Sequence, residues 1–265
     1  MPVVVTGASG PIGKALVPRL VAAGSEVRAV VRRNAAAEEL RALGAKVAVG
    51  DALNPDLLPA VLRDAHTLCH LVDGLFLDEE DYFPVIAGTV QTTVEAARQA
   101  GLARILLVSY PGADAGSRNA YLRAMGTAEE AVRDSGLQHA IVRSTLVVAP
   151  HYRWLEEFGR GRHRLAPVFV EDLAAVLAAA DDRAQSVTAT LGLQGPDTVA
   201  ADELARILGT RAGAMARLRR PRISRTAADI LSRDSLADAP DAAAEFGVKL
   251  TPLREALRAS GFIST

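Results

Sequence analysis

Short apolar runs alternate with longer helical patterns six times in the first 144 residues, and this alternation restricts the fold more than any other feature. The runs are rich in valine and leucine and lie at residues 2–6, 26–33, 46–51, 66–73, 103–109 and 138–144. Between them, apolar residues recur at the three- and four-residue spacing of helices. Strands that alternate with helices form parallel sheets with a helix in each crossover. The sequence therefore predicts an α/β fold with a doubly wound parallel sheet covered on both faces.

The alternation stops after Ser144. One more helix is expected at 168–182, one more strand at 186–193, and further helices at 201–210 and 252–261. We expect residues 1–145 to form the main sheet domain. Residues 146–265 are expected to complete the sheet and to form a smaller lobe over its carboxyl edge.

Three glycines follow the first predicted strand at even spacing, in the stretch TGASGPIG. After a strand, the first glycine permits a sharp turn, the second lets the backbone approach a phosphate, and the third lets the helix pack closely. The helix that follows offers N–H groups and a positive dipole end to a pyrophosphate. Because the loop joins a strand to a helix, it predicts a dinucleotide site rather than a tight turn without ligand. The expected binding residues are Gly7, Ser9, Gly10, Pro11, Ile12 and Gly13.

Two arginines end the second predicted strand. Arg32 and Arg33 stand there, and no acidic residue follows before Glu38. An acidic residue at this point binds the ribose hydroxyl of NAD, whereas a basic one pairs with the 2′-phosphate of NADP. The planar guanidinium suits a phosphate. The sequence favours NADP, as NADPH, over NAD, although Arg33 is equally well interpreted as a solvated strand end.

Later segments extend this pattern, namely VRAVVRR, GDALNPDLL, ILLVSYPGAD, YLRAMGTAEEAVRDSGL, IVRSTLVVAP and LAPVFVEDLAAVL. With the glycine loop, they resemble the extended and atypical branch of the short-chain dehydrogenase/reductase superfamily, with NmrA-like members, over most of the chain. The resemblance implies an NADP-binding Rossmann domain over 1–145 and a substrate lobe over 146–265. It places Asp51 and Ala52 near the adenine, Leu71 and Val72 along the dinucleotide, and Arg143, Ser144 and Thr145 near the nicotinamide.

The resemblance also implies catalytic residues. The family transfers a hydride and uses a Tyr-x-x-x-Lys helix, in which tyrosine handles the proton and lysine lowers its pKa. A serine after the fifth strand orients the carbonyl. Here Tyr121 and Ser109 occupy the tyrosine and serine positions, but Met125 stands in place of the lysine. Without lysine, a tyrosine of pKa ~10 suits proton donation in a reduction better than proton abstraction in an oxidation.

The predicted function is that of an NADPH-dependent reductase of a small carbonyl or unsaturated substrate, with an atypical active site. Two alternatives remain: a non-catalytic NADP-sensing protein of the NmrA-like kind, and a non-redox isomerase, cyclase or dehydratase on the same scaffold. By the same resemblance, residues 151–164 face the substrate.

Composition restricts the partners. The formal net charge is −1, which argues against a general attraction to nucleic acid or membrane surfaces. Five arginines lie in residues 217–225, which we interpret as a solvated connecting segment. The histidines show no metal-site spacing. We expect a small-molecule substrate, no metal, no nucleic acid and no membrane, and a homodimer is compatible with the sequence.

Cys69 is the chain's one cysteine. It lies in the apolar run HTLCHLV, and we interpret it as a buried core side chain. A single cysteine cannot form an internal disulfide, which indicates a reducing compartment. The first strand begins at Pro2 and no apolar run reaches ~20 residues, so we expect neither signal peptide nor membrane span and predict a cytoplasmic location.

Overall fold

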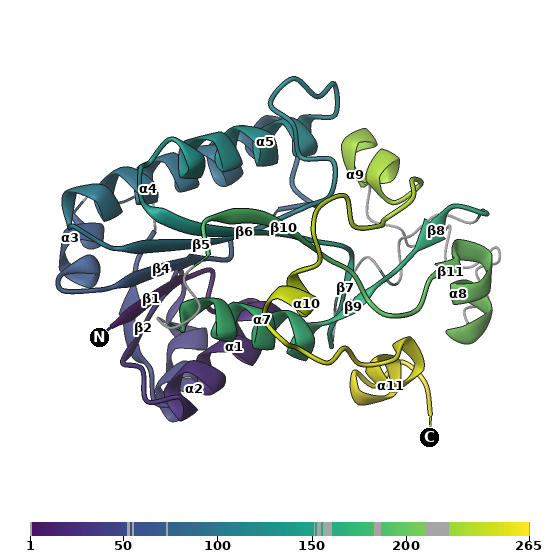
Figure 1. The fold of residues 1–265 in the computed structure, drawn as a ribbon, viewed down its shortest axis with the longest axis horizontal. Coiled ribbons are helices and arrows are strands. Elements are labelled where there is room, and N and C mark those ends of the chain that lie inside the picture. Colours follow the sequence, from purple (N-terminus) through teal and green to yellow (C-terminus); the bar gives the residue numbers. More distant parts are fainter. Residues whose placement is uncertain are drawn as a thin grey trace.

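A parallel seven-stranded sheet forms the centre of the computed structural model (Figure 1), which describes residues 2–51, 54, 56–72, 74–150, 152, 155, 161–182, 187–209 and 223–264. The strand order is β10-β6-β5-β4-β1-β2-β3. The bounds are β1 Val3–Thr6, β2 Val27–Val31, β3 Lys46–Val49, β4 Thr67–His70, β5 Arg104–Ser109, β6 Gln138–Ser144 and β10 Ala189–Leu193. All neighbouring strands of this sheet run parallel. The predicted doubly wound Rossmann-type α/β fold is confirmed.

Helices cover both faces of the sheet (Figure 1). One face carries α3 Leu57–Leu62, α4 Thr89–Gln99 and α5 Ala120–Arg133, and the other carries α1 Pro11–Ala22, α2 Ala37–Ala42 and α7 Val170–Asp181. Alternate strand residues point to opposite faces, so each face has its own core. On the α3–α5 side the buried strand residues include Val4, Leu68, Ile105 and Ile141. On the α1–α7 side they include Val5, Cys69, Leu106 and Val142.

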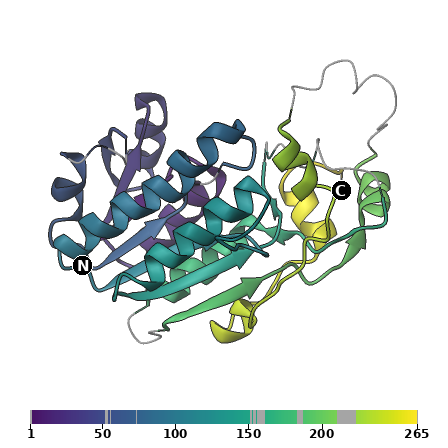
Figure 2. The ribbon, with the colours of Figure 1, turned by 90° about the horizontal axis from the view of Figure 1, so that it is seen from above.

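The second half of the chain returns to the sheet and also extends beyond it. Strand β10 pairs with β6 along Ala189–Leu193. Two small sheets pair β7 Val147–Val148 with β9 Val168–Phe169, and β8 Arg164–Leu165 with β11 Val199–Ala200. Short helices complete this part, namely α8 Ala201–Ile207, α9 Arg225–Ile230, α10 Ala242–Glu245 and α11 Leu253–Ala259. Most of it lies beyond one end of the main sheet (Figure 2).

One expected helix differs in detail. The pattern at 81–101 predicts a continuous helix, but the chain forms a short 3-10 helix at Glu79–Asp81, a π-helix at Phe83–Gly88 and only then α4. The Thr89 hydroxyl bonds back to the carbonyl oxygens of Val85 and Ile86, at 2.5 and 3.1 Å. Such back-bonding by threonine bends helices. The widened turn places Val85 and Thr89 at the cavity described below.

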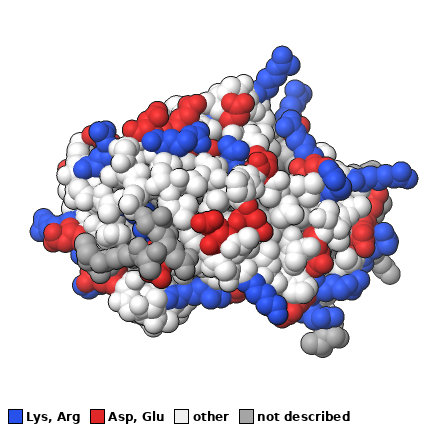
Figure 3. All heavy atoms as spheres, viewed as in Figure 1, with Lys and Arg blue, Asp and Glu red and all other residues white. Residues whose placement is uncertain are grey.

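Acidic and basic side chains are interspersed over the face seen in Figure 3, with one acidic group near its centre. Within the described part of the chain, no helix is both long and apolar enough to span a bilayer. The same residues contain no cluster of three potential metal ligands. Ala52 and the arginines between 217 and 222 lie outside the described residues, as does most of the segment 151–160.

Candidate functional site

A cavity of about 540 Å³ opens where β1, β2, β4, β5 and β6 end. The carboxyl edge of a parallel sheet is where such folds bind ligands. The predicted site residues that line it are Gly7, Ser9, Gly10, Pro11, Ile12, Arg32, Asp51, Leu71, Val72, Ser109, Tyr121, Ser144 and Thr145. Gly13, Arg33 and Arg143 do not line it, and Ala52 lies outside the described residues. The catalytic roles of Ser109 and Tyr121 and the nucleotide-binding roles of the other residues stay predictions.

The structure requires glycine at two of the three glycine positions of the loop, for different reasons. Gly7 has φ +72°, and a Cβ there would lie 2.7 Å from the carbonyl carbon of Leu71. A Cβ on Gly13 would lie 2.4 Å from the carbonyl oxygen of Ala8. Gly10 has ordinary extended angles, and its Cβ would meet only the Gly7 oxygen, at 3.3 Å. The chain itself therefore requires glycine at 7 and 13, whereas Gly10 leaves space on the cavity side for a ligand.

The start of α1 is suited to an anion. Its N-cap is Gly10, no side chain caps it, and its first turn holds no acidic residue. Gly10, Pro11 and Ile12 line the cavity. Since the N-terminal end of a helix carries partial positive charge and N–H donors, this arrangement fits a phosphate group.

Arg32 adds a full positive charge to the same cavity. It directly follows β2, is exposed, and makes no hydrogen bond or ion pair with any described residue. Arg33 is also exposed, but it precedes the 3-10 helix Asn34–Ala36 and does not line the cavity. Of the two arginines that the sequence singles out, Arg32 has the position for a cavity ligand.

Helix α5 presents Tyr121 to the cavity. The helix starts at Asn119, whose Oδ1 accepts hydrogen bonds from the backbone N–H groups of Tyr121 and Leu122, at 3.1 and 3.2 Å. The Tyr121 ring is 3% exposed. It packs edge-to-face against Tyr82 and Tyr110, with ring centroids 5.9 and 5.8 Å apart. The cap and the two rings fix where Tyr121 stands.

The neighbouring tyrosines donate their hydroxyl hydrogens to the protein. Tyr82 donates to the carbonyl oxygen of Leu75 at 2.8 Å, and Tyr110 donates to Oγ of Ser235 at 3.0 Å. Ser235 lies between α9 and α10, and its backbone N–H donates to the carbonyl oxygen of Arg164 in β8. These two tyrosines therefore act as walls around Tyr121.

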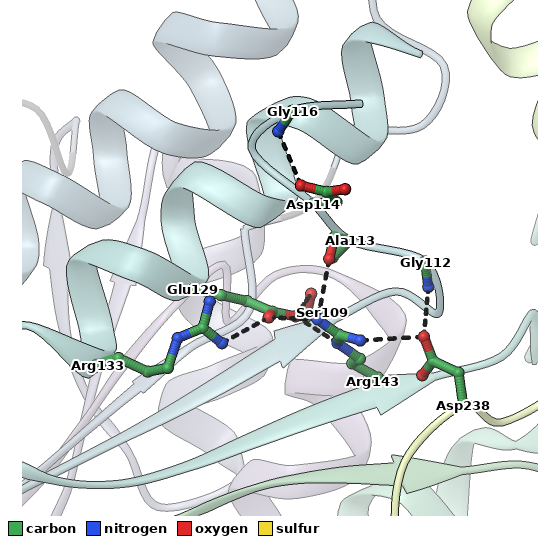
Figure 4. Close-up of polar contacts among 9 residues, drawn as sticks. All are labelled: Ser109, Gly112, Ala113, Asp114, Gly116, Glu129, Arg133, Arg143 and Asp238. Atoms are coloured by element: carbon green, nitrogen blue, oxygen red, sulfur yellow. Dashed lines mark hydrogen bonds and ion pairs between the residues drawn. The ribbon is translucent and has the colours of Figure 1, made fainter. Parts of the chain in front are cut away.

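Ser109 directs its hydroxyl to a residue that sequence reasoning missed (Figure 4). Its Oγ donates to Oε1 of the buried Glu129 at 2.7 Å. Arg143 also bonds Glu129, and its remaining donors go to Ala113 O at 2.9 Å and Asp238 Oδ2 at 3.0 Å. These bonds hold the pKa of Arg143 above its ordinary value. Glu129 lies two helical turns after Tyr121, and this spacing is the one signal for it in the sequence.

The part of the cavity away from the glycine loop is mainly apolar. Its described lining includes Leu75, Phe76, Leu77, Val85, Met125, Leu146, Val147 and Tyr152. Among the described lining residues, only Arg32 and Asp51 carry charge. Tyr152 belongs to the segment 151–164 expected at the substrate, whose His151 and Trp154 lie outside the described residues. This lining fits an uncharged, largely apolar molecule.

A buried histidine lies beneath the cavity at the end of β4. His70 Nδ1 is 2.9 Å from Oγ1 of Thr6 and 3.3 Å from Oγ1 of Thr93. Its Nε2 is 3.4 Å from Oγ1 of the cavity residue Thr89. Burial lowers the pKa of His70 to about 4, so the ring is neutral near pH 7. It links β1, just before Gly7, to the start of α4.

Comparison with known proteins agrees with this geometry. The sequence model of a family described as NAD(P)H-binding matches residues 7–184. The NAD(P)H azoreductase of Xenophilus azovorans is 28% identical over 222 residues, which cover 80% of this chain and 74% of that protein. The ceramide reductase of Caulobacter vibrioides is 33% identical over 150 residues, 56% of this chain and 47% of that protein.

Another relative is an NADH dehydrogenase [ubiquinone] 1 alpha subcomplex subunit 9 of Arabidopsis thaliana, 29% identical over 227 residues. The match covers 77% of this chain and 56% of that protein, so the chain spans about half the length of several curated relatives. The triphenylmethane reductase of Citrobacter sp., solved with NADP(H), superimposes with a TM-score of 0.77 at 23% identity, covering 98% of this chain and 100% of that one. At this identity the likeness shows the fold.

Proposed function

This chain belongs to the NAD(P)H-binding family, of the extended short-chain dehydrogenase/reductase type, and from this premise we propose that it is an NADPH-dependent reductase. Its substrate is a small carbonyl or unsaturated molecule, and its active site is atypical because Met125 replaces the usual lysine. The observation that carries the proposal is the single cavity bordered by both the glycine loop and Tyr121.

The residues present fit the nucleotide. Gly10 leaves room for close approach of a phosphate, the uncapped start of α1 supplies N–H donors, and Arg32 supplies a charge for the 2′-phosphate. The guanidinium of Arg32, which pairs with no residue in the described part of the chain, supports NADP over NAD. When bound, the reduced nicotinamide supplies the hydride.

Tyr121 supplies the proton in this proposal. A phenol that no neighbouring cation activates keeps its proton at neutral pH and serves as a donor in a reduction. The mainly apolar lining of this part of the cavity favours an uncharged substrate. The buried single cysteine supports action in a reducing compartment such as the cytoplasm.

One observation favours a second candidate, a nucleotide-sensing protein without catalysis. Met125 is 2% exposed and lines the cavity in place of the lysine that activates tyrosine in the family. Such a protein would keep the nucleotide site and lose turnover.

Two measurements on the purified protein separate these functions. Isothermal titration calorimetry with NADPH and NADH measures the nucleotide site, and NADPH oxidation across a panel of uncharged ketones, enones and quinones measures turnover. A reductase binds NADPH more tightly than NADH and oxidises it in the presence of at least one panel member. Binding without turnover across the panel supports the sensing function, and absence of NADPH binding contradicts both.

A further inference from the structure

Glu129 is a fully buried acceptor that lies next to the proposed site. Its exposed fraction is 0%, and it accepts four hydrogen bonds from three side chains (Figure 4). Oε1 accepts from Ser109 Oγ at 2.7 Å and from Arg143 Nε at 2.8 Å. Oε2 accepts from a terminal nitrogen of Arg143 at 2.8 Å and from one of Arg133 at 3.0 Å. No oxygen of this carboxylate is left without donors.

The fold itself brings these groups together. Ser109 at the end of β5 stands opposite Arg143 of β6 in the strand register. Helix α5 crosses above them with Tyr121 and Glu129 two turns apart. A Cβ on Gly126 would lie 2.2 Å from the backbone of the loop after β5, so glycine there permits the loop to pack on the helix. The arrangement therefore rests on strand register, helix spacing and one close backbone approach.

Chemistry then decides the direction of the bond to Ser109. An ionised carboxylate that two arginines surround has no hydrogen to give. A serine hydroxyl has one hydrogen, and Ser109 donates that hydrogen to Oε1 of Glu129 in the short contact. In this structure Ser109 can therefore accept a hydrogen bond from a cavity ligand but cannot donate one.

We propose that Glu129 is a positioning residue that holds the hydroxyl hydrogen of Ser109 away from the substrate, so that, of Ser109 and Tyr121, Tyr121 alone donates to the reacting oxygen. This inference rests on the proposed reductase function. In that reduction the carbonyl carbon gains the hydride of NADPH, the carbonyl oxygen gains the phenol proton of Tyr121, and Tyr121 regains a proton from solvent. Ser109 gives no proton or hydrogen bond to the oxygen at any point.

A double-mutant cycle with Ser109→Ala and Glu129→Gln tests the inference. The readouts are kcat and KM for the best ketone of the panel, with NADPH affinity measured by calorimetry for each variant. Ser109→Ala alone is expected to change kcat less than about threefold, because no donor is lost. Loss of a hydrogen bond to a developing oxyanion lowers kcat about 10²–10³-fold. A fall of that size in Ser109→Ala overturns the inference.

In the Glu129→Gln background, Ser109→Ala is expected to have a large effect on kcat instead of a small one. The amide oxygen is expected at the Oε2 position, where two guanidinium nitrogens donate. The amide nitrogen then takes the Oε1 position, where it faces Ser109 and pushes away Arg143 Nε, which donates to Oε1 in the wild type. Ser109 then accepts from Gln and its own hydrogen is free, so adding Ser109→Ala lowers kcat about tenfold or more. Equal effects of Ser109→Ala in both backgrounds overturn the inference. Arg133→Gln is the matched control, because it removes one donor to Glu129 but keeps the contact to Ser109.

Different measurements test the role of Glu129 and the proposed reductase function, so failure of one can be told from failure of the other. Wild-type NADPH binding and panel turnover report on the reductase, whereas the cycle compares variants only with one another. If the wild type turns over no panel ketone or Glu129→Gln does not fold, a crystal structure of the wild type decides. A separation above about 3.5 Å between Ser109 Oγ and the Glu129 carboxylate overturns the inference, and a short contact supports it.

Discussion

Met125 lies one helical turn after Tyr121 on α5, and both side chains line the same cavity. The resemblance to short-chain dehydrogenases/reductases implies a lysine at this second position, where its charge would lower the pKa of the tyrosine. A thioether has no charge, and the 2% exposed Met125 instead packs in the core cluster that also holds Tyr121. The cavity therefore holds the tyrosine proposed as proton donor and, one turn along, a methionine that cannot lower its pKa through charge.

Tyr121→Phe is expected to lower kcat with a ketone roughly 10²–10⁴-fold, because it removes a general acid. The ring contacts to Tyr82 and Tyr110 remain in this variant, so it is expected to fold and to keep its NADPH affinity. The measurement is steady-state NADPH oxidation, together with calorimetric titration of the nucleotide.

Tyr82→Phe is the matched control in the same ring cluster. It removes the hydrogen bonds to Leu75 O and Ser224 Oγ and is expected to lower the free energy of unfolding by about 2 kcal/mol while kcat stays within about threefold. Equal losses of kcat in the two variants would show that the cluster, and not the Tyr121 hydroxyl, supports turnover.

Arg32→Ala is expected to raise the Kd for NADPH about 10- to 100-fold and to leave the Kd for NADH nearly unchanged. The reason is the loss of charged hydrogen bonds to the 2′-phosphate, worth roughly 1.5–3 kcal/mol. Arg33→Ala is the control, because Arg33 is also an exposed arginine but does not line the cavity. Calorimetric titration of both variants with both nucleotides decides. A parallel loss of NADH and NADPH affinity in Arg32→Ala contradicts the preference for NADP.

Alanine substitutions at two glycines of the loop are expected to change different properties of the protein. Gly13→Ala places a Cβ 2.4 Å from the Ala8 carbonyl oxygen and is expected to destabilise the fold by several degrees in Tm. Gly10→Ala meets only the Gly7 oxygen at 3.3 Å, so its Tm is expected to change little while NADPH affinity falls about tenfold or more. Thermal unfolding and calorimetry on the two variants test this. Unchanged NADPH affinity in a folded Gly10→Ala contradicts a phosphate site at Gly10.

Much of the fold could be predicted because the local patterns agree with the global one. The run QHAIVRS predicts a strand at 138–144, and β6 spans the same residues. Alternation of strands and helices predicts the parallel, doubly wound sheet, and the glycine loop predicts the turn at Gly7, where φ is positive. The cavity gathers most of the loop and strand-end residues for the same reason, since parallel strands end at one edge.

Other features depend on tertiary register, which the sequence does not display. Arg143 ends a strand next to the site, yet its guanidinium turns to Glu129 and Asp238. That pairing requires tertiary contacts among β5, β6, α5 and a C-terminal segment, and no local sequence pattern predicts such contacts. The π-helix at Phe83–Gly88 also escapes prediction, because its apolar spacing reads as an ordinary helix.

Cys69 is expected to resist thiol reagents in the folded protein. It is fully buried in β4, and burial raises the pKa of its thiol, which leaves almost no thiolate. The test is labelling with a disulfide reagent at pH 8 with and without denaturant. Labelling that appears only as the protein unfolds agrees with the structure, and rapid labelling of the native protein contradicts the buried placement.

His70 is expected to make the stability of the fold fall in acid. Its pKa is about 4 in the folded protein, below the ordinary value of 6.5, because burial disfavours the charged ring. Between these two values the unfolded chain binds a proton that the folded chain does not. Falling pH therefore favours unfolding across this window, by about 1.4 kcal/mol per pH unit and roughly 3 kcal/mol in total, and the effect is absent above pH 6.5.

His70→Gln tests this through the slope of the free energy of unfolding against pH, measured by denaturant titration between pH 7 and pH 4. The variant is less stable at pH 7 because the contacts to Thr6 and Thr93 change, but its slope is expected to be smaller by one proton. Thr93→Val is the control, since it removes a partner and keeps the ring, so stability falls while the slope stays. A His70→Gln slope equal to that of the wild type contradicts the assignment, because another group then takes up the proton.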